Sequence, residues 1–328
     1  MKVALIGLGS VGRGVAEILS KKDLGLVLTG IADSKSAFMD PAGIDIARVL
    51  ANKKKNGYCG DQKLTAEDVI KKADYDALIE VTPTNALSGE PAIGYIKAAL
   101  NRRKYVVTSN KGPIALAAKE LRAMAKKKGV ALRYEATVAG AIPVMHTLEN
   151  GLAGNEILAL YGVLNGTCNF ILTRMAAEGL TYEQALMEAR EMGYAEADPT
   201  YDVQGIDAAI KLVILANTIW DNGVKLSDVD RTGIDLLTPD ALRLADEEGC
   251  TIRLIAEANP KKHLLRVSPR ILDRNHPLVF EGTLNALTLE TDMAKEITLI
   301  GRGAGSIETA SAIIGDLLYI RDRYVQRT

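Results

Sequence analysis

A glycine-rich turn between a strand and a helix is the feature that most constrains the fold of this chain. Residues 2–6 form a short apolar run typical of a buried strand, and residues 10–20 carry apolar side chains at helical spacing. The turn between them has the GxGxxG spacing, which permits a tight turn, a close approach to a pyrophosphate and close helix packing. We therefore predict that the dinucleotide-binding residues of the turn are Gly7, Leu8, Gly9, Ser10, Val11 and Gly12.

The second predicted strand, residues 26–32, ends in Asp33, twenty-one positions after the last glycine of the turn. A carboxylate at this position meets the adenosine ribose hydroxyls and favours NAD, because it repels the 2′-phosphate of NADP. Lysines 53–55 can fold back to the same edge, where ammonium and hydroxyl groups together can hold a phosphate. We therefore predict that both cofactors are used, with a preference below about a hundredfold, or roughly 2.7 kcal/mol. Ser34 and Lys35, which follow the carboxylate directly and precede Ser36, are therefore also predicted cofactor contacts.

Strands and helices alternate along the first part of the chain. Such alternation predicts a mostly parallel, doubly wound sheet, in which ligands bind beyond the carboxyl ends of the strands. Thr82 and Lys111 follow predicted strands and are therefore candidate cofactor contacts. The predicted strands are 76–82, 105–108 and 130–134, and the predicted helices are 92–100 and 114–128.

The pattern changes after about residue 135. Between residues 251 and 289, apolar and polar side chains alternate between turn signals, which indicates an antiparallel sheet. A second glycine turn at 301–305 and an apolar helix at 307–319 predict a return to the first domain. The expected fold is α/β, with a Rossmann-type nucleotide-binding domain formed by residues 1–134 and 302–328. Residues 135–301 are expected to form a second, α+β domain.

Composition excludes several classes of protein. The chain has 40 Lys and Arg against 41 Asp and Glu, so it lacks the strongly basic character of nucleic-acid-binding proteins. No apolar run approaches the roughly 18 residues of a membrane span, and the amino terminus lacks a signal-peptide pattern. Cys59, Cys168 and Cys250 are far apart, which disfavours a disulfide framework or a zinc site. A cytoplasmic protein without nucleic-acid or membrane partners is expected.

One acid–lysine pair stands in a strongly apolar segment. Asp207 and Lys211 are four residues apart and share a helix face, while the surrounding residues 206–216 are apolar on every side. A helix that is apolar all round is buried. Exposed pairs at this spacing stabilise a helix by only a few tenths of a kcal/mol, roughly, and are common. Breaking a buried pair costs about 3–5 kcal/mol while forming one rarely gains stability, which favours a functional role.

The segment from Glu196 to Lys211, EADPTYDVQGIDAAIK, closely resembles the signature of homoserine dehydrogenases. Gly112 departs slightly from the residue usual in the family. The resemblance implies reversible reduction of L-aspartate 4-semialdehyde to L-homoserine by NADPH or NADH, on the pathway to threonine and methionine. It also implies a homodimer built through the sheet of the second domain, which would hold the substrate. Four further blocks match in family order: residues 110–113, 135–140, 164–167 and 303–305.

The resemblance also implies roles for individual residues. Lys211 would donate the proton as hydride reaches the aldehyde carbon, and Asp207 would orient it. Lys111 would lie near both nicotinamide and substrate, and is the alternative proton carrier. Gly303 would contact the cofactor. The residues implied for substrate binding are Glu196, Asp202, Thr167 and Asn165. Those that resemble a loop binding a monovalent cation, usually sodium, largely through backbone oxygens are Glu135, Val138, Gly140 and Ile142.

Two other interpretations remain open at this point. Another nicotinamide enzyme, such as an aspartate or diaminopimelate-type dehydrogenase, would share the glycine turn but would not account for residues 193–211. A non-catalytic nucleotide sensor would need no buried acid–lysine pair.

Many longer family members carry a C-terminal domain through which threonine inhibits them. Only nine residues follow Tyr319, so we expect this chain to be a short form without that domain.

Overall fold

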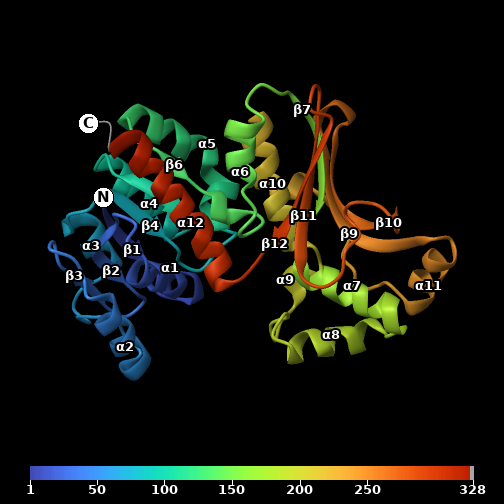
Figure 1. The fold of residues 1–328 in the computed structure, drawn as a ribbon, viewed down its shortest axis with the longest axis horizontal. Helices are drawn as coiled ribbons and strands as arrows, with labels where there is room; N and C mark the ends of the chain where they lie inside the picture. Colours follow the sequence, from blue (N-terminus) through green and yellow to red (C-terminus); the bar gives the residue numbers. More distant parts are fainter. Residues whose placement is uncertain (326–328) are drawn as a thin grey trace. The chain divides into compact units, whose positions relative to one another are not determined.

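The structure is a computed structural model that describes residues 1–325 and divides into two compact units (Figure 1). The first unit contains Met1–Pro143 and the C-terminal segment from Gly305, and the second contains Val144–Ala304. The first limit, at Pro143, lies nine residues beyond the expected residue 134, and the second, at Ala304, lies three beyond the expected residue 301. The turn Glu135–Thr137 packs with the first unit, and the last strand of the second unit runs on to Arg302. Within the described residues, no helix combines the length and apolar character needed to cross a membrane.

The first unit is built on a six-stranded sheet in the order β3-β2-β1-β4-β5-β6 (Figure 1). All neighbouring strands are parallel except β2 and β3. The predicted parallel sheet is therefore confirmed, and the order reverses direction at β1, as in other doubly wound folds. The strands are β1 Lys2–Ile6, β2 Val27–Ala32, β3 Ala37–Met39, β4 Ala77–Glu80, β5 Tyr105–Thr108 and β6 Leu132–Arg133.

The C-terminal helix α12 returns to the first unit, as the sequence predicted. It packs against α1, where the hydroxyl of Ser306 donates to the carbonyl of Ser10 at 2.6 Å. Gly14 permits this approach, because a Cβ added there would lie 2.6 Å from the Ser306 carbonyl oxygen. The helices of this unit are α1 Ser10–Lys21, α2 Ile46–Asn56, α3 Ala66–Lys72, α4 Ala92–Asn101, α5 Lys111–Lys128 and α12 Ser306–Ile320.

The second unit also contains a six-stranded sheet, in the order β12-β11-β7-β9-β10-β8. Its long strands pair antiparallel, which confirms the prediction for residues 251–289. Gly301 and Arg302 pair with β11 as the end of β12, so the predicted glycine turn at 301–305 begins later than expected. The strands are β7 Ile157–Val163, β8 Asp230–Arg231, β9 Cys250–Asn259, β10 Leu264–Asp273, β11 Leu284–Thr291 and β12 Glu296–Arg302.

Helix α10 is the buried helix of the second unit. It packs against β9 and β10, and its residues 207–216 are all buried. The apolar pattern around its whole circumference correctly predicted this burial. The helices of the unit are α6 Val144–His146, α7 Gly166–Glu178, α8 Tyr182–Glu191, α9 Thr200–Val203, α10 Ile206–Trp220 and α11 Pro239–Glu247.

Candidate active site

The glycine turn after β1 leaves room for a ligand at its second glycine. Gly7 has φ +103°, and a Cβ added there would lie 2.6 Å from the carbonyl oxygen of Val81. A Cβ at Gly12 would lie 2.0 Å from the carbonyl oxygen of Gly7, so packing of the chain itself requires both glycines. In the described part of the chain, no atom lies within 4 Å of a Cβ added at Gly9. Gly9 is also the N-cap of α1 and offers the helix no side-chain acceptor, so the first N–H groups can bind a phosphate.

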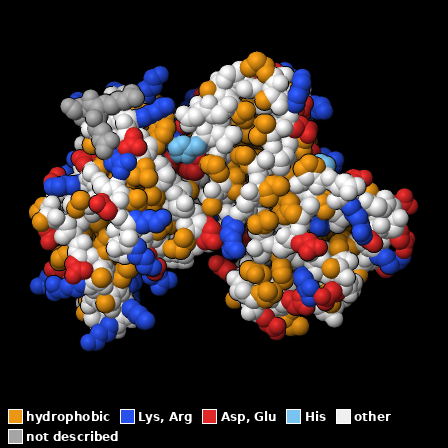
Figure 2. Space-filling view, in the orientation of Figure 1, with side chains coloured by type: hydrophobic (Ala, Val, Ile, Leu, Met, Phe, Trp, Pro, Cys, Tyr) orange, Lys and Arg blue, Asp and Glu red, His pale blue; other side chains and the backbone are white. Residues whose placement is uncertain are grey.

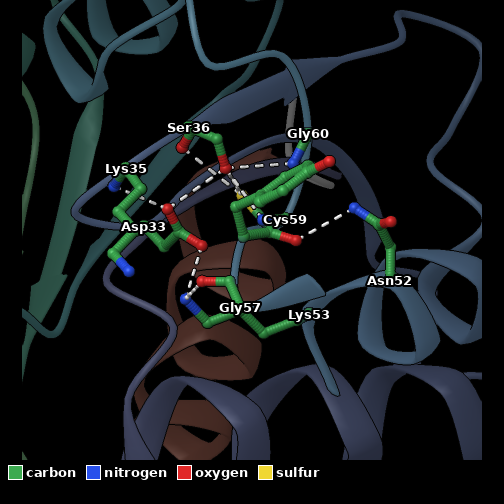
Figure 3. Close-up of polar contacts among 9 residues, drawn as sticks. Asp33, Lys35, Ser36, Asn52, Lys53, Gly57, Cys59 and Gly60 are labelled. Atoms are coloured by element: carbon green, nitrogen blue, oxygen red, sulfur yellow. Dashed lines mark hydrogen bonds and ion pairs between the residues drawn. The ribbon is translucent and has the colours of Figure 1, made fainter. Parts of the chain in front are cut away.

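Asp33, at the end of β2, accepts hydrogen bonds on both carboxylate oxygens (Figure 3). Lys53 Nζ lies 2.6 Å from Oδ2, and the backbone N–H of Lys35 lies 2.8 Å from Oδ1. The hydroxyl of Ser36 donates to Oδ1 at 3.1 Å. Burial of the carboxyl is the largest single influence and opposes ionisation, but the hydrogen bonds together outweigh it and lower the pKa of Asp33. This carboxylate is therefore ionised and largely neutralised by an ammonium group.

The loop around Asp33 is fixed by a second set of bonds. Ser36 Oγ accepts from the N–H groups of Cys59 at 2.8 Å and Gly60 at 3.0 Å (Figure 3). Of the lysines expected to fold back to this edge, Lys53 does so from α2. Lys54 and Lys55 are exposed at the end of that helix, where Figure 2 shows basic side chains gathered.

Thr82 and Lys111 lie beside a buried polar cluster at the ends of β4 and β5. The N–H and hydroxyl of Thr82 both donate to Glu80, and Lys111 is the first residue of α5 after its N-cap, Asn110. Burial raises the pKa of the Glu80 carboxyl, and hydrogen bonds from Thr82, Thr108 and Asn110 offset only part of that effect. The sequence analysis missed Glu80. A single acid in an otherwise apolar strand was the available signal.

In the second unit, four of the predicted residues form one hydrogen-bonded cluster. Asn165 donates through Nδ2 to Asp202 Oδ1 at 2.6 Å and to Asp207 Oδ2 at 3.1 Å. Lys211 Nζ lies 2.7 Å from Asp207 Oδ2 and donates to the carbonyl oxygen of Leu164 at 2.6 Å. The side chains of the Asp207–Lys211 pair are each 9% exposed. The pair is therefore desolvated, as the sequence predicted, and its geometry is tight.

Local structure explains where this cluster forms. Gly205 has φ +70° and begins α10, which places Asp207 in the first turn and Lys211 one turn later. A carboxylate in the first turn is favoured by the helix dipole. Asn165 caps α7, because its Oδ1 accepts from the N–H of Cys168 at 2.9 Å. The amino ends of α7 and α10, together with Asp202 on α9, thus bring the amide, the carboxylates and the ammonium together.

Gly303 lies in the second unit, next to Asn285. A Cβ added at Gly303 would lie 2.0 Å from Asn285 Cγ. The Nδ2 of Asn285 donates to the carbonyl oxygen of Leu164 at 2.9 Å, the same oxygen that accepts from Lys211. Gly303, which is predicted to contact the cofactor, therefore also leaves the space that Asn285 needs beside the carbonyl oxygen bonded to Lys211.

Glu196 and Thr167 stand apart from this cluster. Glu196 is exposed, and within residues 1–325 it forms no hydrogen bond with the four clustered residues. The hydroxyl of Thr167 donates to the carbonyl oxygen of Tyr194 at 2.8 Å. Cys168 is fully buried beneath the cluster, and burial, followed by the charges of Asp202 and Asp207, raises the pKa of its thiol well above the usual value. It is therefore not an activated nucleophile.

The residues predicted to hold a cation lie in one buried segment of the first unit. Glu135 and Ile142 are 2% and 3% exposed, Val138 and Gly140 are buried, and Ala139 and Gly140 both have positive φ. Among the described residues, no group of three or more His, Cys, Asp or Glu side chains is placed to hold a metal. A cation in this segment would therefore depend on backbone oxygens.

Comparison with known proteins covers both units. The profile of the homoserine dehydrogenase NAD-binding domain matches residues 7–135, and the homoserine dehydrogenase profile matches residues 143–318. The homoserine dehydrogenase of Methanocaldococcus jannaschii is 45% identical over 98% of each chain. The NAD(+)-dependent homoserine dehydrogenase of Pseudomonas canavaninivorans is 38% identical over 97% of this chain and 96% of its own.

A solved structure agrees with these matches. The crystal structure of a putative homoserine dehydrogenase from Archaeoglobus fulgidus has a TM-score of 0.92 and 46% identity, and covers 98% of this chain and 99% of its own. The similarity extends over the glycine turn, the acid–lysine motif and both sheets. The chain belongs to the homoserine dehydrogenase family.

Proposed function

We propose that the Asp207–Lys211 pair transfers the proton in the reaction of this homoserine dehydrogenase, the reversible reduction of L-aspartate 4-semialdehyde to L-homoserine. One observation carries the proposal. An ammonium group has three N–H donors, and within residues 1–325 Lys211 uses two of them, on Asp207 and on the carbonyl of Leu164. The third can donate to a substrate oxygen. Negative charge develops on that oxygen in the transition state, which is where a positioned donor accelerates the reaction.

The two units supply different parts of the chemistry. The nicotinamide cofactor, when bound, provides or accepts the hydride. Residues Gly7 to Gly12 and Asp33 fit its pyrophosphate and ribose, and Thr82 and Lys111 are proposed contacts of its reactive half. Lys211 donates a proton to the carbonyl oxygen during reduction and recovers it during oxidation. Asp207 holds the ammonium group in place and balances its charge.

The amino-acid head of the substrate is assigned to the second unit. Asp202 and Asn165 are joined at 2.6 Å, and Asn165 also reaches the catalytic pair, which supports a shared substrate pocket. An ammonium group of the substrate would be attracted to Asp202 and to the exposed Glu196. Thr167 is assigned to the same pocket from its place in the matching motif.

The activity itself is tested by spectrophotometry. L-Homoserine should reduce NAD⁺ or NADP⁺ in the presence of the enzyme, whereas L-aspartate and L-threonine should not. An absence of homoserine-dependent reduction with either cofactor would overturn the assignment.

Asp33 and Lys53 lead to a prediction about cofactor choice. Because Lys53 neutralises the carboxylate at 2.6 Å, we expect the kcat/KM values for NAD⁺ and NADP⁺ to differ by less than about a hundredfold. Asp33→Asn should shift the ratio toward NADP⁺ by roughly tenfold, since it removes the repulsion of the 2′-phosphate. Asp23→Asn, at an exposed position in the same unit, is the matched control and should leave the ratio unchanged. A ratio that does not move in Asp33→Asn would show that the carboxylate has no part in cofactor choice.

A monovalent cation is proposed for the segment that contains Glu135, Val138, Gly140 and Ile142. The backbone of this segment is anchored, since the N–H of Glu135 donates to Asp316 Oδ2 at 2.9 Å. A bound cation would hold the loop in one conformation. Exchange of sodium chloride for choline chloride at constant ionic strength should lower activity, and equal activity in both salts would argue against the site.

A homodimer formed through the second sheet is also proposed. Apolar side chains on this sheet are exposed, with Ile271 on β10 at 67% and Ile300 on β12 at 50%, and Figure 2 shows hydrophobic side chains across the visible face of this unit. Light scattering should give about twice the chain mass of 35.2 kDa, and Ile300→Asp should lower that mass toward a single chain. A monomeric wild-type enzyme would contradict the dimer.

A cytoplasmic location is proposed as well, in keeping with the free thiols of Cys59, Cys168 and Cys250.

A further inference from the structure

Glu80 is a buried carboxylate in the first unit for which the reaction described above has no use. It is the last residue of β4 and is 0% exposed. Its Oε1 accepts from the backbone N–H and the hydroxyl of Thr82, and its Oε2 accepts from the hydroxyl of Thr108 at 2.8 Å. In the described part of the chain, the donors that reach it are neutral N–H and O–H groups. A carboxylate buried without a cation is costly to keep, so its retention calls for a purpose beyond stability.

The bonds around Glu80 have a fixed direction. Both carboxylate oxygens receive donors, so the hydroxyls of Thr82 and Thr108 point their hydrogens at Glu80 and their lone pairs away from it. Those lone pairs accept from Asn110: its N–H lies 2.9 Å from Thr108 Oγ1, and its Nδ2 lies 3.3 Å from Thr82 Oγ1. The Oδ1 of Asn110 is thereby turned toward the start of α5, where it accepts from the N–H of Gly112 at 3.1 Å.

The same cluster therefore sets two loops at once. Thr82 is on the loop after β4, and Asn110 both ends the loop after β5 and caps the helix whose first residue is Lys111. In a doubly wound sheet, ligands bind at these carboxyl ends. The residues that fit the adenosine half, Gly9 and Asp33, lie after β1 and β2 and form no hydrogen bond with this cluster within residues 1–325.

We propose that Glu80 is a positioning residue for the nicotinamide half of the site. Its two oxygens accept hydrogen bonds and thereby set the direction of hydrogen bonding through Thr82, Thr108 and Asn110, which fixes the loops that carry Thr82 and Lys111. The inference rests on the proposed assignment of those two residues to the reactive half of the cofactor. Replacement of the carboxylate by an amide of equal size would place a donor where only acceptors fit.

The test uses Glu80→Gln with the pair Thr108→Val and Thr108→Ser. In Glu80→Gln and Thr108→Val, kcat for homoserine oxidation should fall at least about tenfold, and the Kd of NAD⁺ should rise at least about fivefold. The Kd of ADP-ribose, which lacks the nicotinamide ring, should stay within about twofold by calorimetry. Thr108→Ser keeps the hydroxyl and should behave as the wild type.

The outcomes separate positioning from general structural damage. Equal weakening of NAD⁺ and ADP-ribose binding, or a Thr108→Ser variant as impaired as Thr108→Val, would overturn the proposal. So would folded variants with unchanged kcat and unchanged NAD⁺ affinity. If Glu80→Gln does not fold, the Thr108 pair decides alone. If the wild type fails to oxidise homoserine, the proposed function has failed, but the two dissociation constants still test Glu80.

Discussion

Lys211→Ala is expected to lower kcat for homoserine oxidation by about 10²–10⁴-fold. The ammonium group is needed only while charge changes on the substrate oxygen, so its loss removes transition-state stabilisation and not cofactor binding. Apart from Gly303, the residues assigned to the cofactor lie in the first unit, whereas Lys211 is on α10 of the second. The Kd of the nicotinamide cofactor should therefore stay within about twofold of the wild-type value.

Two further lysine variants make this result interpretable. Lys262→Ala, at an exposed position in the same unit, should leave kcat unchanged. Lys111→Ala tests the alternative proton carrier. Near-normal kcat in Lys211→Ala, together with a large loss of kcat in Lys111→Ala, would show that Lys111 and not Lys211 carries the proton.

Asp207→Ala is expected to lower the free energy of unfolding by about 3–5 kcal/mol, because it leaves the buried ammonium of Lys211 without an anion. The double variant Asp207→Ala/Lys211→Met removes both charges and should recover most of that loss while remaining inactive. Asn165 would still donate to Asp202 at 2.6 Å, so the rest of the cluster keeps its partner. Urea denaturation measures the free energy of unfolding of each variant, and the comparison holds where the m-values are equal.

This comparison distinguishes two reasons for a buried ion pair. Recovery of stability without recovery of activity would show that the pair is kept for chemistry. A double variant as unstable as Asp207→Ala would instead show that the pair holds the fold together, and the catalytic interpretation would lose its energetic support.

Much of the fold could be predicted from local pattern. The bounds of β1 and β5 match the prediction at both ends, because each is a run of apolar residues between clear turn signals. The three-residue strand β3 was missed, since its only support is antiparallel pairing with β2. β6 is shorter than predicted because only Leu132 and Arg133 pair with β5. Such pairing depends on tertiary contacts that periodicity does not carry.

Local pattern likewise predicted some residues of the candidate site but not those that tertiary contacts bring together. Asp207 and Lys211 are four residues apart in an apolar helix, so both their contact and their burial could be expected. Glu80 could not be assigned a role, because its partner Thr108 is 28 residues away and only the parallel pairing of β4 and β5 brings them together. Glu196 stands in the same motif as the clustered residues yet is exposed, which shows that proximity in a motif does not fix contact.

Chemical rescue tests the central claim, that the side chain of Lys211 moves the proton, most directly. Homoserine-dependent reduction of the nicotinamide cofactor by Lys211→Ala would be measured with increasing methylamine, beside Lys111→Ala and the wild type. The account predicts that the rate of Lys211→Ala rises with the amine concentration, while the other two enzymes do not respond. Rescue of Lys111→Ala in place of Lys211→Ala would contradict it.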